Sequence, residues 1–151
     1  MKNGIVIIAH APLASALRLS VVHVFAERAE QVVAVDVQPD ATVSHSLAQA
    51  QQAMAPLGDV PLLLLTDVMG ATPCNVARQV LEVGERGEKR EACVLAGVNL
   101  PMLLRAITYQ NEPLAALAAC ALQGGTQGVL AVANCPALDT VKQSEMESNK
   151  S

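Results

Sequence analysis

Short apolar runs alternate with longer amphipathic stretches along this chain. The runs lie at residues 5–8, 32–35, 62–65 and 93–96. Continuous runs of this length, rich in Val, Ile and Leu, are typical of strands buried on both faces of a parallel sheet. A fifth run, at residues 129–132, predicts one further strand.

Between these runs, apolar residues recur at the three- and four-residue spacing of amphipathic helices. The clearest stretch follows Pro12, a residue suited to the first turn of a helix, and its apolar side chains are Leu13, Leu17, Val21 and Phe25. The other expected helices run from Asp40 or Thr42 to Pro56, from Pro73 with Val76, Val80 and Val83 inward, over residues 102–109, and over residues 114–122 with Gly124 and Gly125 at the end. Alternating strands and helices predict an α/β fold, in which a doubly wound and mostly parallel sheet has helices on both faces.

Length and composition indicate a single globular domain. The chain has 151 residues, of which 52% are hydrophobic and 16% charged. This composition is too apolar for a disordered chain. We expect residues 1–138 to form the domain and the polar residues 139–151 to form a disordered tail.

The charge and the length of the apolar runs exclude two classes of partner. The net charge is −4, and the sequence shows no basic patch of the kind that binds nucleic acid. No apolar run is long enough to cross a bilayer, and no signal-peptide pattern precedes the first run. We therefore expect a cytoplasmic protein that is peripheral to the membrane at most.

The sequence predicts neither a metal site nor a bound cofactor. The four cysteines are scattered and form no C-x-x-C pair, so we expect reduced core residues, and no ligand spacing supports a zinc site with the three histidines. Neither a P-loop nor a G-x-G-x-x-G motif is present, and a G-x-S-x-G hydrolase elbow is also missing.

Polar residues follow three of the predicted strands. His10 comes at the end of the first, Asp67 follows the third, and residues 97–99 follow the fourth. Ligands of such sheets bind at the carboxyl ends of the strands, and we expect Asn99 to shape the last turn and not to touch the ligand. A carboxylate on one ring nitrogen would fix the histidine tautomer and stabilise the charge that the ring gains on attack. Gly70 permits close approach of the backbone to a ligand, and Thr72 offers a hydroxyl near free helix N–H groups. These residues predict a phosphohistidine site; the plainer alternative is an ordinary polar pair.

Three segments resemble one known family. They are residues 4–10 (GIVIIAH), 66–75 (TDVMGATPCN) and 96–102 (AGVNLPM). In this order they resemble the enzyme IIA component of the mannose family of the bacterial phosphotransferase system, over roughly residues 3–133. The phosphoryl-relay subunit of dihydroxyacetone kinase shares that fold, but residues 97–102 favour the mannose family.

The resemblance implies a phosphotransferase in which His10 accepts a phosphoryl group from phospho-HPr and passes it to a IIB component. It implies that Asp67 hydrogen-bonds His10, and that Gly70, Ala71 and Thr72 bind the phosphoryl group. Family members are often homodimers that exchange a C-terminal strand, a role that residues 129–132 could play. A regulatory binding module, in which phosphorylation of His10 controls a partner protein, is the alternative.

The chain departs from the family pattern at several positions around the site. Ala11 stands where glycine usually follows the histidine, and Gly70-Ala71-Thr72 replaces Gly-Gly-Ser. Met69 and Cys74 stand where aromatic residues are common, and Met69, which lies beside the predicted site, is a candidate for a docking surface. Because Thr72 keeps the hydroxyl, these changes bear on the choice of IIB partner more than on phosphorylation.

Overall fold

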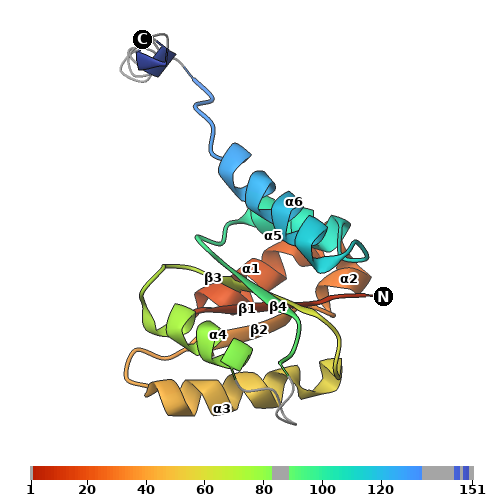
Figure 1. Cartoon of the computed structure of the whole chain (residues 1–151), viewed down its shortest axis with the longest axis vertical. Helices are drawn as coiled ribbons and strands as arrows, with labels where there is room; N and C mark the ends of the chain where they lie inside the picture. The colour runs from red at the N-terminus through yellow and green to blue at the C-terminus, as the bar shows by residue number, and fades with distance from the viewer. Residues whose placement is uncertain (1, 83–88, 134–144, 147, 150–151) are drawn as a thin grey trace.

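The computed structural model describes residues 2–82, 89–133, 145–146 and 148–149. Within them, parallel strands form one four-stranded sheet in the order β2-β1-β3-β4 (Figure 1). The strands are β1 (Gly4–His10), β2 (Val33–Val37), β3 (Leu62–Thr66) and β4 (Ala92–Ala96). The helices are α1 (Leu13–Val22), α2 (Ala26–Ala29), α3 (Val43–Met54), the 3-10 helix η1 (Ala55–Leu57), α4 (Thr72–Glu82), α5 (Leu100–Thr108) and α6 (Leu114–Gln127). The predicted α/β class with a parallel sheet is confirmed.

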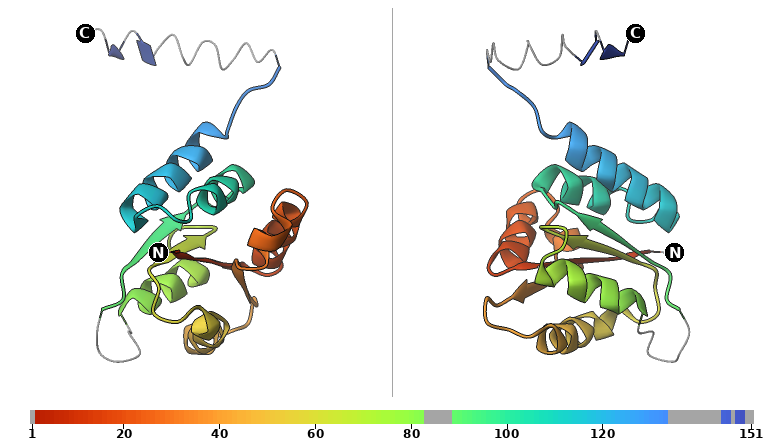
Figure 2. Two further views of the ribbon diagram at one scale, coloured as in Figure 1. Left: turned by 90° about the vertical axis from the view of Figure 1, so that its right-hand side faces the viewer. Right: turned by 60° about the vertical axis from the view of Figure 1, so that its left-hand side comes forward.

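Helices cover both faces of the sheet, as Figures 1 and 2 show. Successive side chains of a strand point to opposite faces, so Ile5 and Ile7 of β1 pack in one core layer while Val6 and Ile8 pack in the other. The first layer includes buried residues of α1, α5 and α6, and the second includes buried residues of α3 and α4. This double burial explains why the strands appear in the sequence as continuous apolar runs.

The strand register sets the geometry of the carboxyl edge. Ile8 of β1 lies beside Thr66, the last residue of β3. β1 continues two residues further, to His10, which pairs with Val37 at the end of β2. His10 and the residue that follows β3 therefore meet at this edge.

Two helix predictions differ from the structure. The helix predicted from Leu13 to Phe25 is divided, because α1 ends at Val22 and Phe25 precedes α2. Gly124 and Gly125 do not end α6, which continues to Gln127. Close packing explains why glycine occurs there, since a Cβ at Gly124 would overlap Cγ of Arg105 on α5. Thr42, by contrast, caps α3 as one of the two predicted candidates.

The prediction of a fifth strand is wrong for the single chain. Residues 129–132 follow α6 without regular structure, and Val129, Leu130 and Val132 are 77%, 75% and 95% exposed. No strand of the described residues lies beside them to complete a ladder. Val83, most of the charged segment 84–91, Cys135 and most of the predicted tail lie outside the described residues.

Candidate functional site

His10 and Asp67 form a direct contact at the carboxyl edge of the sheet. The His10 Nδ1 and Asp67 Oδ2 atoms are 2.6 Å apart. The backbone N–H of His10 donates to the same oxygen at 3.0 Å, and the N–H of Val68 donates to Oδ1 at 2.9 Å. The predicted proximity of the two side chains is thus confirmed.

The two partners differ in exposure, and this difference fits an accessible nucleophile held by a shielded carboxylate. The His10 side chain is 50% exposed and that of Asp67 is 10% exposed. An ionised carboxylate only accepts hydrogen bonds, so Nδ1 of His10 carries the proton in this contact. In the neutral ring the lone pair then lies on Nε2, the nitrogen that the carboxylate leaves free.

Hydrogen bonds keep Asp67 ionised. Desolvation by burial acts to raise the pKa of Asp67, but the backbone N–H and ring of His10 and the N–H of Val68 together hold that pKa below its usual value. The carboxylate is therefore charged at neutral pH. A charged carboxylate can stabilise positive charge on the imidazole ring.

We expect the stabilising effect of the Asp67 carboxylate to disappear in acid. Because its pKa is lowered on folding, its contribution to the free energy of unfolding is present above about pH 4 and is lost as the pH falls through the folded-state value. Urea unfolding of the protein and of Asp67→Ala should differ by about 1–2 kcal/mol at about pH 7, and this difference should shrink as the pH falls below about 4. An undiminished difference in acid would contradict stabilisation through the ionised carboxyl.

The loop after Asp67 brings a helix N-terminus to the same edge. Gly70 has a φ of +84°, a left-handed conformation that favours glycine, and no heavy atom lies within 4 Å of a Cβ built there. The backbone conformation, and not space, therefore requires glycine at this position. Ala71 precedes α4, which begins at Thr72, one residue before the predicted Pro73.

The first turn of α4 offers hydrogen-bond donors for an anion. Its first N–H groups, apart from Pro73, which has none, have no partners within the helix, and they point out of its N-terminal end. The Thr72 hydroxyl is half-buried and forms no hydrogen bond with another described residue. Gly70, Ala71 and Thr72 thus lie between Asp67 and the first turn of α4, and their binding of a phosphoryl group stays a prediction.

Residues 97–99, which the sequence places at the end of the fourth predicted strand, support this edge through backbone hydrogen bonds that the sequence does not predict. The N–H of Gly97 donates to the Asp67 carbonyl at 2.9 Å, and the N–H of Val98 donates to the Thr66 carbonyl at 2.9 Å. Gly97 also has a φ of +84°. The sequence marks this position by a glycine after the fourth predicted strand, but the two hydrogen bonds follow from the placement of β4 beside β3. Asn99 caps α5 by accepting from the Met102 N–H, so the prediction that it shapes this turn is confirmed.

Apolar side chains are exposed next to the site. Met69 is 83% exposed, and Val68, which adjoins Asp67, is 57% exposed. Met69 is a sequence-based candidate for a docking surface, whereas no pattern in the sequence singles out Val68. Exposed apolar residues beside a reactive group are typical of a surface that contacts another protein.

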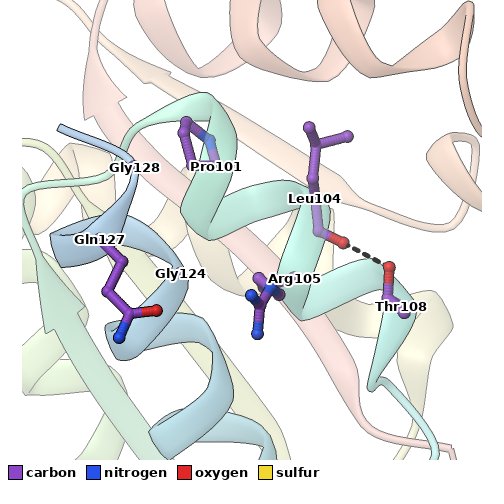
Figure 3. Close-up of a pocket in the computed structure, with 7 residues that line it drawn as sticks. All are labelled: Pro101, Leu104, Arg105, Thr108, Gly124, Gln127 and Gly128. Atoms are coloured by element: carbon purple, nitrogen blue, oxygen red, sulfur yellow. Dashed lines mark hydrogen bonds between the residues drawn. The ribbon is translucent and has the colours of Figure 1, made fainter. Parts of the chain in front are cut away.

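Other candidate features lie apart from this edge. A groove of about 450 Å³ lies between α5 and α6, and Figure 3 shows its lining residues, which include none of the predicted site residues. Among the described residues, no three His, Cys, Asp or Glu side chains are grouped so that they could hold a metal ion. No helix within the described ranges is long and apolar enough to span a membrane.

The fold and the site together define a parallel α/β protein with a histidine–aspartate pair at the carboxyl edge of its sheet. A family model described as the PTS system fructose IIA component, EIIA-man, matches residues 4–122. The chain belongs to this family of IIA components of the phosphotransferase system, and the resemblance seen in the sequence is confirmed.

Solved structures agree with this assignment. The mannose/sorbose-specific IIA subunit from Enterococcus faecalis is 27% identical, with a TM-score of 0.76, and the match covers 89% of this chain and 98% of that one. An EIIA component from Streptococcus agalactiae is 24% identical, with a TM-score of 0.74 and coverages of 88% and 99%. A sigma-54 interaction domain protein from E. faecalis shares the fold at 16% identity, with a TM-score of 0.65 and coverages of 80% and 88%. No curated protein matches the chain significantly.

Proposed function

We propose that His10 accepts a phosphoryl group from phosphorylated HPr and passes it to a IIB component during sugar uptake. The observation that carries this proposal is the 2.6 Å contact between His10 Nδ1 and Asp67 Oδ2. It leaves Nε2 as the nucleophile on a half-exposed ring. Membership of a phosphotransferase-system family supports the choice of donor and acceptor, and the composition supports a cytoplasmic location.

Each transfer moves the phosphoryl group from one nucleophile to the next. In the first transfer, the Nε2 lone pair attacks phosphorus as the bond to the donor atom of phospho-HPr breaks, and the bonding electrons leave with that donor atom. The Nδ1 proton stays in place, so the His10 ring gains positive charge while it faces the Asp67 carboxylate. Attack by the IIB residue on the same phosphorus reverses these changes.

The turn at the start of α4 supplies the second half of the site. The Gly70 N–H and the Thr72 hydroxyl would donate to the phosphoryl oxygens. The Ala71 N–H, which donates to the Val68 carbonyl at the long distance of 3.4 Å, would exchange that contact for a phosphoryl oxygen. These donors would bind the spread negative charge of the phosphoryl group more tightly in the transition state than before transfer.

Transfer to a IIB protein tests the direction of the relay. The chain is first phosphorylated with phosphoenolpyruvate, enzyme I and HPr, then freed of donors and mixed with a mannose-family IIB protein. Loss of phosphate from His10 with a matching gain on IIB within seconds supports the relay. Retention of phosphate in the presence of all tested IIB proteins would contradict it.

A regulatory module is the second candidate, because the fold also occurs in a sigma-54 interaction domain protein. In that function the phosphoryl group on His10 would change binding of a partner protein, with little flux through the site. Stable phosphorylation together with phosphate-dependent binding of a partner would favour this second function.

Met69 would contact the donor and acceptor proteins. We expect Met69→Asp to raise the KM for phospho-HPr by roughly tenfold while kcat changes little, since a charge is placed on an apolar contact outside the reacting atoms. Leu19→Asp, at an exposed apolar residue of α1, is the matched control and should leave both constants unchanged. Equal effects of the two substitutions would place the docking surface elsewhere.

We also propose a homodimer in which residues 129–132 add to the sheet of a second copy. β4 is an edge strand, and the exposed apolar side chains of Val129, Leu130 and Val132 have no covering element among the described residues. Sedimentation equilibrium should show twice the chain mass, and removal of residues 129–151 should yield the monomer. A monomeric full chain would contradict this arrangement.

A further inference from the structure

The N-terminus of helix α1 is capped by a side chain of strand β2. Pro12 occupies the cap position, and no side chain of the helix's own cap residue accepts a hydrogen bond from its first turn. Asp36 of β2 takes this role instead. Its Oδ1 accepts from the Ser15 N–H at 3.1 Å, and its Oδ2 accepts from the Ser15 hydroxyl. A carboxylate at this end of a helix also offsets the positive end of the helix dipole.

This cap lies close to His10 along the chain and across the sheet. Asp36 pairs with Ala9, the residue before His10, and only Ala11 and Pro12 separate His10 from α1. The Ala11 N–H donates to the Val37 carbonyl at 2.9 Å. The chain on both sides of His10 is therefore held by β2, while the His10 N–H and ring are held by Asp67 after β3.

We infer that Asp36 is a positioning residue for His10. By fixing Ser15 and the first turn of α1, it fixes the two-residue connection that leaves His10 and so holds the imidazole ring against Asp67. A shift of the first turn of α1 would pass through Ala11 and Pro12 to a contact of 2.6 Å, which tolerates little displacement. The effect on phosphoryl transfer rests on the proposed function, whereas the effect on the His10 ring does not.

A purely structural role predicts a different result. If Asp36 only stabilised α1, its loss would lower the free energy of unfolding and leave the His10 ring unchanged in the folded protein. A positioning role also changes the environment of Nδ1 and the preference for the tautomer with its proton there. The ¹⁵N shifts of the two ring nitrogens report that preference directly.

The experiment compares Asp36→Ala and Asp36→Asn with Asp40→Ala. Asp40→Ala removes an exposed carboxylate that follows the same strand, so it controls for net charge. We expect Asp36→Ala to move the ¹⁵N shifts of His10 toward a tautomer mixture and to slow phosphorylation by roughly tenfold, because a misplacement of about 1 Å can cost up to about 100-fold. Asp36→Asn keeps an oxygen that accepts a hydrogen bond from the Ser15 N–H, so its ring shifts and its phosphorylation rate should lie close to those of the wild-type protein. Asp40→Ala should match the wild-type protein in both measurements.

Unchanged ring shifts in a folded Asp36→Ala protein would overturn the inference. If the wild-type protein takes up no phosphoryl group, the proposed function fails. The ¹⁵N shifts of the His10 ring then decide the role of Asp36 by themselves. If Asp36→Ala does not fold, Ser15→Ala removes only the hydroxyl contact and should give a smaller shift in the same direction. Ring shifts that stay unchanged in Ser15→Ala would then overturn the inference.

Discussion

Replacement of His10 by alanine is expected to abolish phosphoryl uptake while leaving the fold intact. His10 supplies the only nucleophile of the proposed reaction, so its loss removes the chemistry and does not merely slow it. The side chain is half exposed at a strand end, and its one described side-chain partner is Asp67. Incubation with phosphoenolpyruvate, enzyme I and HPr followed by intact mass measurement checks uptake, and circular dichroism checks the fold.

His45→Ala is the matched control for this prediction. His45 is also exposed, but it lies in the first turn of α3 and contributes only its backbone N–H to the Thr42 cap. Uptake by His45→Ala should equal that of the unchanged protein. Acid-labile phosphate on His10→Ala, or loss of uptake in His45→Ala, would place the phosphorylated residue elsewhere.

Replacement of Asp67 by alanine should slow phosphorylation by roughly 10- to 1,000-fold, since both ring orientation and charge stabilisation are lost. Asp67→Asn keeps an oxygen that can accept from the His10 N–H but carries no charge. The phosphorylation rate of Asp67→Asn should therefore lie between the rates of the wild-type protein and Asp67→Ala. A time course of uptake at fixed phospho-HPr gives the three rates.

The order of these rates separates orientation from charge. An Asp67→Asn rate near that of the unchanged protein would show that orientation dominates, and one near Asp67→Ala would show that the charge dominates. Asp67→Ala within about twofold of the unchanged rate would contradict any role for the carboxylate in the transfer, because a lost electrostatic contact of this kind costs at least about tenfold.

The site geometry could be predicted because it follows from strand ends. Continuous apolar runs mark β1 and β3 clearly, and parallel strands place the residues that follow them at one edge, so the proximity of His10 and Asp67 needed no further knowledge of packing. The class of fold followed from the same alternation of strands and helices.

The missed features depend on tertiary packing. Glycine is common directly after a helix, so Gly124 and Gly125 predict a helix end. They lie inside α6 instead, because α5 packs closely against them. The fifth run, residues 129–132, has a strand-like sequence, but no strand of the described residues lies beside it. The contact of Asp36 with Ser15 joins residues that only the β1–β2 register brings together, so no local pattern marks it.

Intact mass after incubation with phosphoenolpyruvate, enzyme I and HPr tests the central claim most directly. We predict a gain of about 80 Da, one phosphoryl group, that is lost in mild acid and maps to the peptide containing His10. A folded protein that gains no mass with a range of HPr proteins, or that carries an acid-stable phosphate on another residue, would contradict the proposed phosphohistidine relay.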